Sequence, residues 1–71
     1  MNKNDQACEY LKARAAKLGA NVSVYAVAGV GGRVKHFTMM RKGAYPTDRR
    51  VEVSLEDPAD IFAAKVRHLM G

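Results

Sequence analysis

The apolar residues of this 71-residue chain repeat with a helical period near both ends and with a strand period in between. In the N-terminal part they recur at spacings of three and four, at Cys8, Leu11, Ala15 and Leu18. This spacing predicts an amphipathic helix from about Asn4 to Leu18, because such residues share one face of a helix. Asn2 or Asn4 can cap its start, and Gly19 can end it in the left-handed conformation.

The last segment of the chain predicts a second amphipathic helix with well-marked ends. Asp57 is the expected cap, Pro58 the first helical residue, and Gly71 follows the last turn. The apolar face of this helix is expected to consist of Ala59, Phe62, Ala63, Val66, Leu69 and Met70. Both helices therefore need an apolar surface to cover.

Between the helices, three segments alternate between apolar and polar residues, as strands with two different faces do. They are residues 21–28, 33–40 and 49–55. The inward residues of the first and third are Val22, Val24, Ala26, Val51, Val53 and Leu55. The register of the second segment is ambiguous, because Lys35, Phe37 and Met39 compete for the inward side with Val34, His36, Thr38 and Met40. We place Phe37 and Met39 inside. Lys35 on that face can extend its long side chain to water, whereas a buried His36 could not.

Glycines separate the first two of these strands. Gly29, Gly31 and Gly32 are expected to supply the positive-φ positions of a hairpin turn. A phosphate-binding loop is the alternative, but no Gly-Lys-Ser/Thr follows, and the next segment is a strand rather than a helix. A longer loop over residues 41–48, which contains Gly43 and Pro46, leads to the third strand.

These elements predict one α+β domain over residues 1–71, in the order α-β-β-β-α. Three antiparallel strands form a meander, and both helices pack on one face of the sheet. The opposite face would then stay open and display Tyr25, Val27, His36, Thr38, Arg50 and Glu52. An open face on so small a domain predicts a docking surface for a partner or for a second copy in a homodimer.

Positive charge is concentrated in one part of the chain. Residues 33–50 hold six basic residues and one acidic residue, and the rest of the chain holds six of each, for a net charge of +5. A neutral scaffold with one cationic segment suggests a surface for a negatively charged partner. The candidate binding residues are Arg33, Lys35, Arg41, Lys42, Tyr45, Arg49 and Arg50, with Tyr25 and His36 on the open face. The alternative is an ordinary solvated surface.

The order of the elements resembles that of the double-stranded-RNA-binding domain. That family has phosphate-binding lysines at the start of its second helix, where this chain has Glu56, Asp57 and Asp60. Acidic residues there would repel a phosphate backbone, so binding in that family's manner is not predicted. The small toxin nucleases that share this order use a histidine on the second strand, near His36. Their glycine-serine-histidine signature is absent, because Gly32 is followed by Arg33.

No pattern typical of a catalytic, metal or cofactor site is present, so we expect a non-enzymatic regulatory binding protein without metal or cofactor. Its expected partner is nucleic acid, or a nucleoprotein or host protein complex that handles nucleic acid. The alternative is a small phage or mobile-element type inhibitor that blocks a host protein or defence complex through the open face. Cys8, the lone cysteine, is expected to be a small core residue. The single cysteine, together with the lack of a signal sequence and of a membrane span, predicts a cytoplasmic protein.

Overall fold

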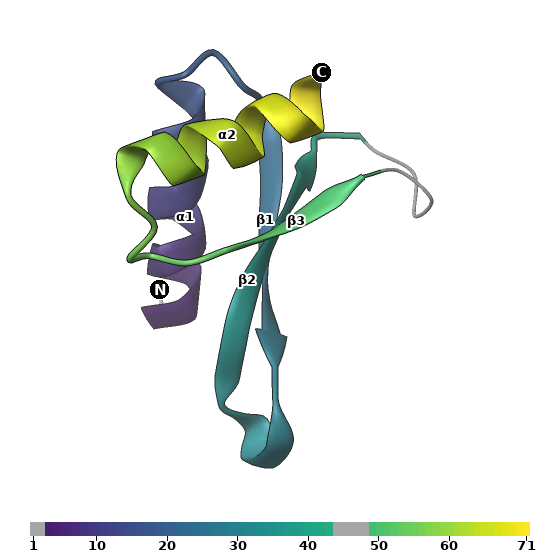
Figure 1. Ribbon diagram of the computed structural model, residues 1–71. Coiled ribbons are helices and arrows are strands. Elements are labelled where there is room, and N and C mark those ends of the chain that lie inside the picture. The colour runs from purple at the N-terminus through teal and green to yellow at the C-terminus, as the bar shows by residue number, and fades with distance from the viewer. Residues whose placement is uncertain (1–2, 44–48) are drawn as a thin grey trace.

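The computed structural model describes residues 3–43 and 49–71, and its elements follow the predicted order (Figure 1). The helices and strands are α1 (Lys3–Ala16), β1 (Val22–Ala28), β2 (Val34–Arg41), β3 (Arg50–Val53) and α2 (Ala59–Met70). The strands form one antiparallel sheet in the order β1-β2-β3, so β2 is the central strand. The predicted α+β architecture is therefore confirmed.

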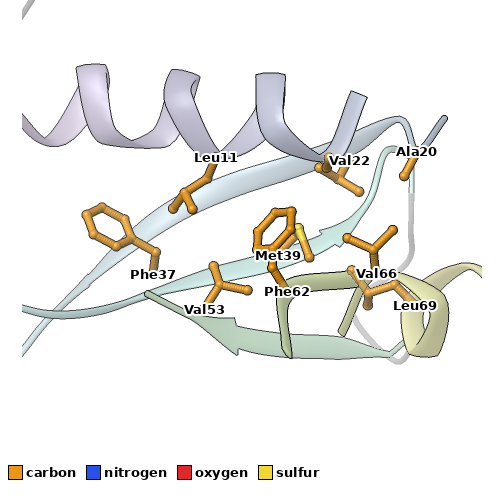
Figure 2. Packing of buried hydrophobic residues seen from close by; sticks show 10 residues of the cluster. Leu11, Ala20, Val22, Phe37, Met39, Val53, Phe62, Val66 and Leu69 are labelled. Carbon is orange, nitrogen blue, oxygen red and sulfur yellow. The ribbon is translucent and has the colours of Figure 1, made fainter. Parts of the chain in front are cut away.

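One face of the sheet and the two helices that cover it form the hydrophobic core (Figure 2). Its buried residues are Leu11, Ala15, Ala20, Val22, Phe37, Met39, Val53, Phe62, Val66 and Leu69. Helix α1 packs mainly on β1, and α2 packs less extensively on β2 and β3. Phe37 and Met39 lie on the covered face, as predicted for the second strand. None of the described helices is both long enough and apolar enough to cross a membrane.

Helix α1 ends at Ala16 because the next residues form a tight turn. The N–H of Gly19 donates to the carbonyl of Ala16 at 2.9 Å, and the N–H of Ala20 donates to that of Ala15 at 3.1 Å. This Schellman arrangement requires a left-handed residue, and Gly19 has a φ of +80°. The turn directs Leu18 outward, where it is 52% exposed, and buries Ala20 instead. The prediction that Leu18 belongs to the buried stripe is wrong.

The turn between β3 and α2 also differs from the prediction. β3 ends at Val53, and the backbone N–H of Ser54 donates to the Asp57 carboxylate at 3.0 Å. This turn leads the chain away from the sheet, so Leu55 is 47% exposed and is not an inward strand residue. Pro58, rather than Asp57, immediately precedes α2. Asp57 cannot act as the predicted cap because its carboxylate is engaged within the turn.

The ends of both helices carry fewer core residues than their sequence patterns predict. In α2, Phe62, Val66 and Leu69 are buried, whereas Ala59 and Met70 at its two ends are exposed. Ala59 and Met70 are the first and last residues of α2, and they lie outside the core that the residues between them join. Helix α1 begins at Lys3, which places the proposed cap Asn4 inside the helix.

Strands β1 and β2 form a long hairpin that extends beyond β3 and the helices (Figure 1). A short 3-10 turn over Val30–Gly32 joins the strands, and Gly31 and Gly32 have the predicted positive φ. Gly29 does not, since its φ is −96° and its conformation is extended, so that part of the prediction is wrong. Next to the tip, the β1–β2 register skips Lys35, which is the extra residue of a β-bulge on β2.

The face of the sheet away from the helices is less open than predicted. Thr38 on the central strand is only 6% exposed, because Tyr25 and Glu52 flank it on the neighbouring strands. Val27 and His36 are half-buried. The exposed residues of this face are Tyr25, Arg50 and Glu52. Side chains from the two edge strands therefore dominate the accessible surface of this face.

Candidate anion-binding site

Four basic residues lie where β2 ends and β3 begins: Arg41, Lys42, Arg49 and Arg50. The β2–β3 register ends at the pair Met40↔Arg50, and continuing it by one step would set Arg41 opposite Arg49. Both arginines line one cavity of about 270 Å³, together with the end of α2. We call this cavity the arginine hollow; its lining residues are Arg41, Arg49, Leu69, Met70 and Gly71.

Arg49 is held in place at the hollow by helix α2. Its Nη1 donates to the backbone carbonyl of His68 at 2.9 Å. His68 lies in the last turn of α2, where carbonyls have no partner within the helix, so this bond satisfies an otherwise unpaired acceptor. A guanidinium group has five N–H donors, which leaves others for a ligand. Because Arg49 is already ordered, it loses little conformational freedom when a ligand binds.

The electrostatics of the arginine hollow favour an anion. Like charges opposite each other across a sheet repel, although the partial negative charge at the C-terminal end of α2 offsets part of that repulsion. Of the described residues that line the hollow, none has an acidic side chain. Arg67 and His68 add basic groups in the last turn of α2. A phosphate or carboxylate between Arg41 and Arg49 would accept charge-assisted hydrogen bonds from both and relieve their repulsion.

No protein-family model, curated protein or solved structure matches this chain. The order of elements that it shares with the double-stranded-RNA-binding domain is therefore a likeness of topology alone.

The other basic candidates do not belong to the arginine hollow. Arg33 precedes β2 and Arg41 ends it, and eight residues of extended strand span about 26 Å. Lys35 is in the bulge near the same far end of the hairpin. Tyr45 lies outside the described residues. The sequence cluster over residues 33–50 is therefore divided in space between two ends of β2.

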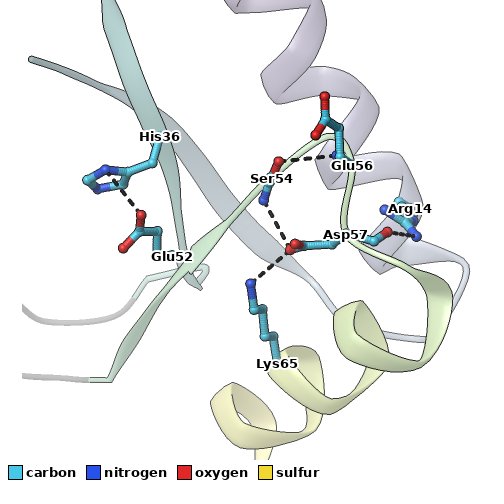
Figure 3. Close-up of polar contacts among 7 residues, drawn as sticks. All are labelled: Arg14, His36, Glu52, Ser54, Glu56, Asp57 and Lys65. Carbon is cyan, nitrogen blue, oxygen red and sulfur yellow. Dashed lines mark hydrogen bonds and ion pairs between the residues drawn. The ribbon is translucent and has the colours of Figure 1, made fainter.

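His36, on the open face, has a carboxylate beside it. Its Nδ1 lies 3.5 Å from Glu52 Oε1, which is longer than an ordinary hydrogen bond, and this nitrogen is buried without a hydrogen-bond partner (Figure 3). The pair borders a cavity of about 580 Å³ lined by His36, Phe37, Glu52, Val53, Ser54, Asp57 and Lys65. Glu52 therefore lies at ion-pair distance from His36 without fixing the orientation of the imidazole by a hydrogen bond. Among the described residues, no three His, Cys, Asp or Glu side chains form a potential metal site.

Asp57 organises a polar cluster that the sequence pattern did not predict (Figure 3). Its Oδ2 accepts hydrogen bonds from Lys65 Nζ at 2.9 Å and from the Ser54 N–H at 3.0 Å. Burial raises the pKa of Asp57, but these hydrogen bonds and the charges of Lys65 and Arg14 outweigh it, and the pKa is lowered overall. The spacing of eight residues between Asp57 and Lys65 gives no recognisable sequence signal, because they meet only once the turn has formed.

Arg14 is the second residue whose role the sequence pattern did not predict. Its Nη2 donates to the backbone carbonyl of Asp57 at 2.8 Å, and its Cζ lies 4.4 Å from the centre of the Phe62 ring. It therefore joins α1 to both the turn before α2 and α2 itself. The available signal was its position on the helix, directly beside the apolar stripe and three residues after Leu11.

Cys8 is half-buried and packs against the core, in agreement with its predicted structural role. Burial, followed by the nearby carboxylates of Asp5 and Glu9, raises the pKa of the Cys8 thiol, against a smaller lowering by Lys12. A raised pKa reduces the thiolate fraction at neutral pH, so the surroundings of Cys8 do not activate its thiol as a nucleophile.

Proposed function

We propose that this chain is a non-enzymatic, regulatory binding protein that docks the arginine hollow on the phosphate backbone of a nucleic acid. The observation that carries the proposal is the opposed pair Arg41 and Arg49 in one hollow, with Arg49 already anchored on His68. A phosphate is the anion that this geometry suits, because arginine side chains bind its oxygens with several donors at once.

Neighbouring charges favour a polymer of phosphates over a single small anion. Lys42 and Arg67 are exposed and close in sequence to residues that line the hollow, on the adjoining loop and helix end. Successive phosphates along a nucleic acid could contact them while one phosphate occupies the hollow. We also place the protein in the cytoplasm, where the single Cys8 would remain reduced.

Replacing both arginines should weaken nucleic-acid binding strongly and leave folding intact. We expect Arg41→Gln with Arg49→Gln to lower affinity for a labelled oligonucleotide about tenfold, the change that ~1.4 kcal/mol produces. The slope of log affinity against log salt should fall by roughly 0.7–0.9 for each phosphate that the double variant no longer binds. Fluorescence anisotropy over a salt series measures both, with single-stranded and duplex probes compared.

The matched control is Lys3→Gln with Lys17→Gln, which removes the same charge from exposed positions on and just after α1. Equal reductions of affinity in the two double variants would show that only net charge matters and would refute the site. Cleavage of the oligonucleotide that His36→Ala abolishes would make the protein a nuclease instead. Recovery from lysate of one protein partner, insensitive to nuclease treatment, would favour the inhibitor alternative.

A further inference from the structure

Strand β1 is an edge strand with no feature that protects it from pairing. It lies at one side of the sheet, and no described strand pairs with its outer side (Figure 1). Its 7 residues, VSVYAVA, include no charged residue and no proline. Natural edge strands are usually blocked by such residues or by bulges. The bulge in this hairpin has its extra residue, Lys35, on β2, so β1 itself stays regular.

The ladder with β2 determines which backbone groups of β1 point outward. The N–H of Lys42 donates to the carbonyl of Asn21 at 3.1 Å, in the same register as the pair Val22↔Arg41. Asn21 and Lys42 are thus a hydrogen-bonded pair, and such pairs alternate along an antiparallel ladder. The odd-numbered residues of β1 therefore bond to β2. The residues whose N–H and C=O groups point to the outer edge are Val22, Val24, Ala26 and Ala28.

We infer that β1 pairs with β1 of a second copy of this chain, antiparallel and about a two-fold axis at Tyr25. This register alone matches every outward residue of one copy with an outward residue of the other. It places Val24 opposite Ala26 on the covered face, where both already pack against the core. On the other face it places the two Tyr25 side chains, each 39% exposed, directly opposite each other, where aromatic pairs are favourable.

The charges along α1 suit the same partner. A cavity of about 360 Å³ runs beside the β1 edge, lined by Asn4, Asp5, Cys8, Glu9, Lys12, Val24, Tyr25 and Ala26. The two-fold axis relates the two α1 helices, which therefore run antiparallel to each other on the same side of the joined sheet. The α1 residues beside this edge include the acidic Asp5 and Glu9 and the basic Lys12, and Lys12 Nζ already lies 3.5 Å from Glu9 Oε1 within one copy. An antiparallel α1 from a second copy would therefore bring groups of both signs together rather than like charges alone. The two arginine hollows lie at opposite ends of such a dimer, so their positive charges do not repel each other across the interface.

The dimer should dissociate when the β1 edge is blocked. Light scattering at increasing protein concentration should give a mass approaching twice 7.8 kDa for the unmodified chain. Tyr25→Asp places like charges opposite each other at the axis and should raise the dissociation constant about tenfold or more. Ala26→Pro removes an outward N–H without breaking the β1–β2 ladder and should have a similar effect. Tyr10→Asp, at another exposed tyrosine outside the cavity, should leave the mass unchanged.

Hydrogen exchange distinguishes this edge-to-edge dimer from association through the open face. The amides of Val22, Val24, Ala26 and Ala28 should become more protected as protein concentration rises. The odd-numbered amides of β1 should be protected at every concentration, because they bond to β2. A chain that stays monomeric, or a dimer in which the even-numbered amides remain unprotected, would overturn the inference. So would a dimer that persists in both Tyr25→Asp and Ala26→Pro while each variant keeps its fold.

Discussion

Phe62→Ala should lower the free energy of unfolding by about 3–5 kcal/mol, the usual cost of truncating a buried phenylalanine. Phe62 is 1% exposed and is among the largest fully buried side chains of the core. A domain this small has a total stability of only about 5 kcal/mol, so the variant should keep about 0–2 kcal/mol, and up to about half of it should be unfolded at room temperature. Urea denaturation followed by circular dichroism measures the decrease in stability.

The size of that decrease depends partly on Arg14, whose guanidinium group lies against the Phe62 ring. A double-mutant cycle with Arg14→Met and Phe62→Leu should therefore give a coupling free energy of about 0.5–2 kcal/mol. Arg14→Met keeps the length of the side chain and removes the charge, and Phe62→Leu keeps the site apolar. Independent effects of the two changes, or a Phe62→Ala melting transition shifted by only a degree or two, would show that α2 does not pack as described.

Asp57→Ala should destabilise the fold by about 1–3 kcal/mol at neutral pH, the usual range for the loss of hydrogen bonds to a charged group. The substitution leaves the Ser54 N–H and the Lys65 ammonium without their shared acceptor. It also weakens the turn that ends β3 and positions α2. Thermal unfolding of Asp57→Ala beside Glu56→Ala, an exposed acidic neighbour, measures the difference, and equal melting temperatures would contradict the role given to Asp57.

The same carboxylate should make stability depend on pH. The pKa of Asp57 is lower in the folded chain than its ordinary value of 3.8, so the folded state favours the ionised form. Its contribution is complete above the unfolded pKa and disappears as pH falls through the folded pKa. The unmodified chain should therefore lose stability below about pH 4, and Asp57→Asn should lose less over that range. Parallel pH profiles for the two proteins would refute this.

The periodic parts of the sequence and the positive-φ glycines Gly19, Gly31 and Gly32 were predicted well, whereas the turn between β3 and α2 was not. The alternation of Val51 and Val53 and the helical spacing of Phe62 and Val66 were sufficient to place β3 and α2, because burial of one face determines register. Leu55 continued the strand pattern but lies outside the strand, because the Ser54–Asp57 hydrogen bond redirects the chain. Such a turn depends on a side-chain carboxylate meeting a backbone N–H, which hydrophobic periodicity does not encode.

The candidate site was predicted only in part, for a similar reason. The pairing of Arg41 with Arg49 followed from their positions on either side of one loop. Their meeting with the end of α2 did not, since it depends on how the last helix crosses the sheet. Arg33 was grouped with them because it is close in sequence, but an extended strand carries neighbours apart instead of together.

The tip of the β1–β2 hairpin offers a practical means of labelling this protein. Val30 is fully exposed there, and a side chain added at Gly31 or Gly32 would meet no atom within 4 Å, although the positive φ of both glycines disfavours direct substitution. A short epitope or a fluorophore-bearing loop inserted after Val30 should therefore be tolerated, since exposed loop tips accept insertions. Such a reporter would lie far from the arginine hollow and beyond the central Tyr25 of β1. Both surfaces could then be assayed with one tagged protein.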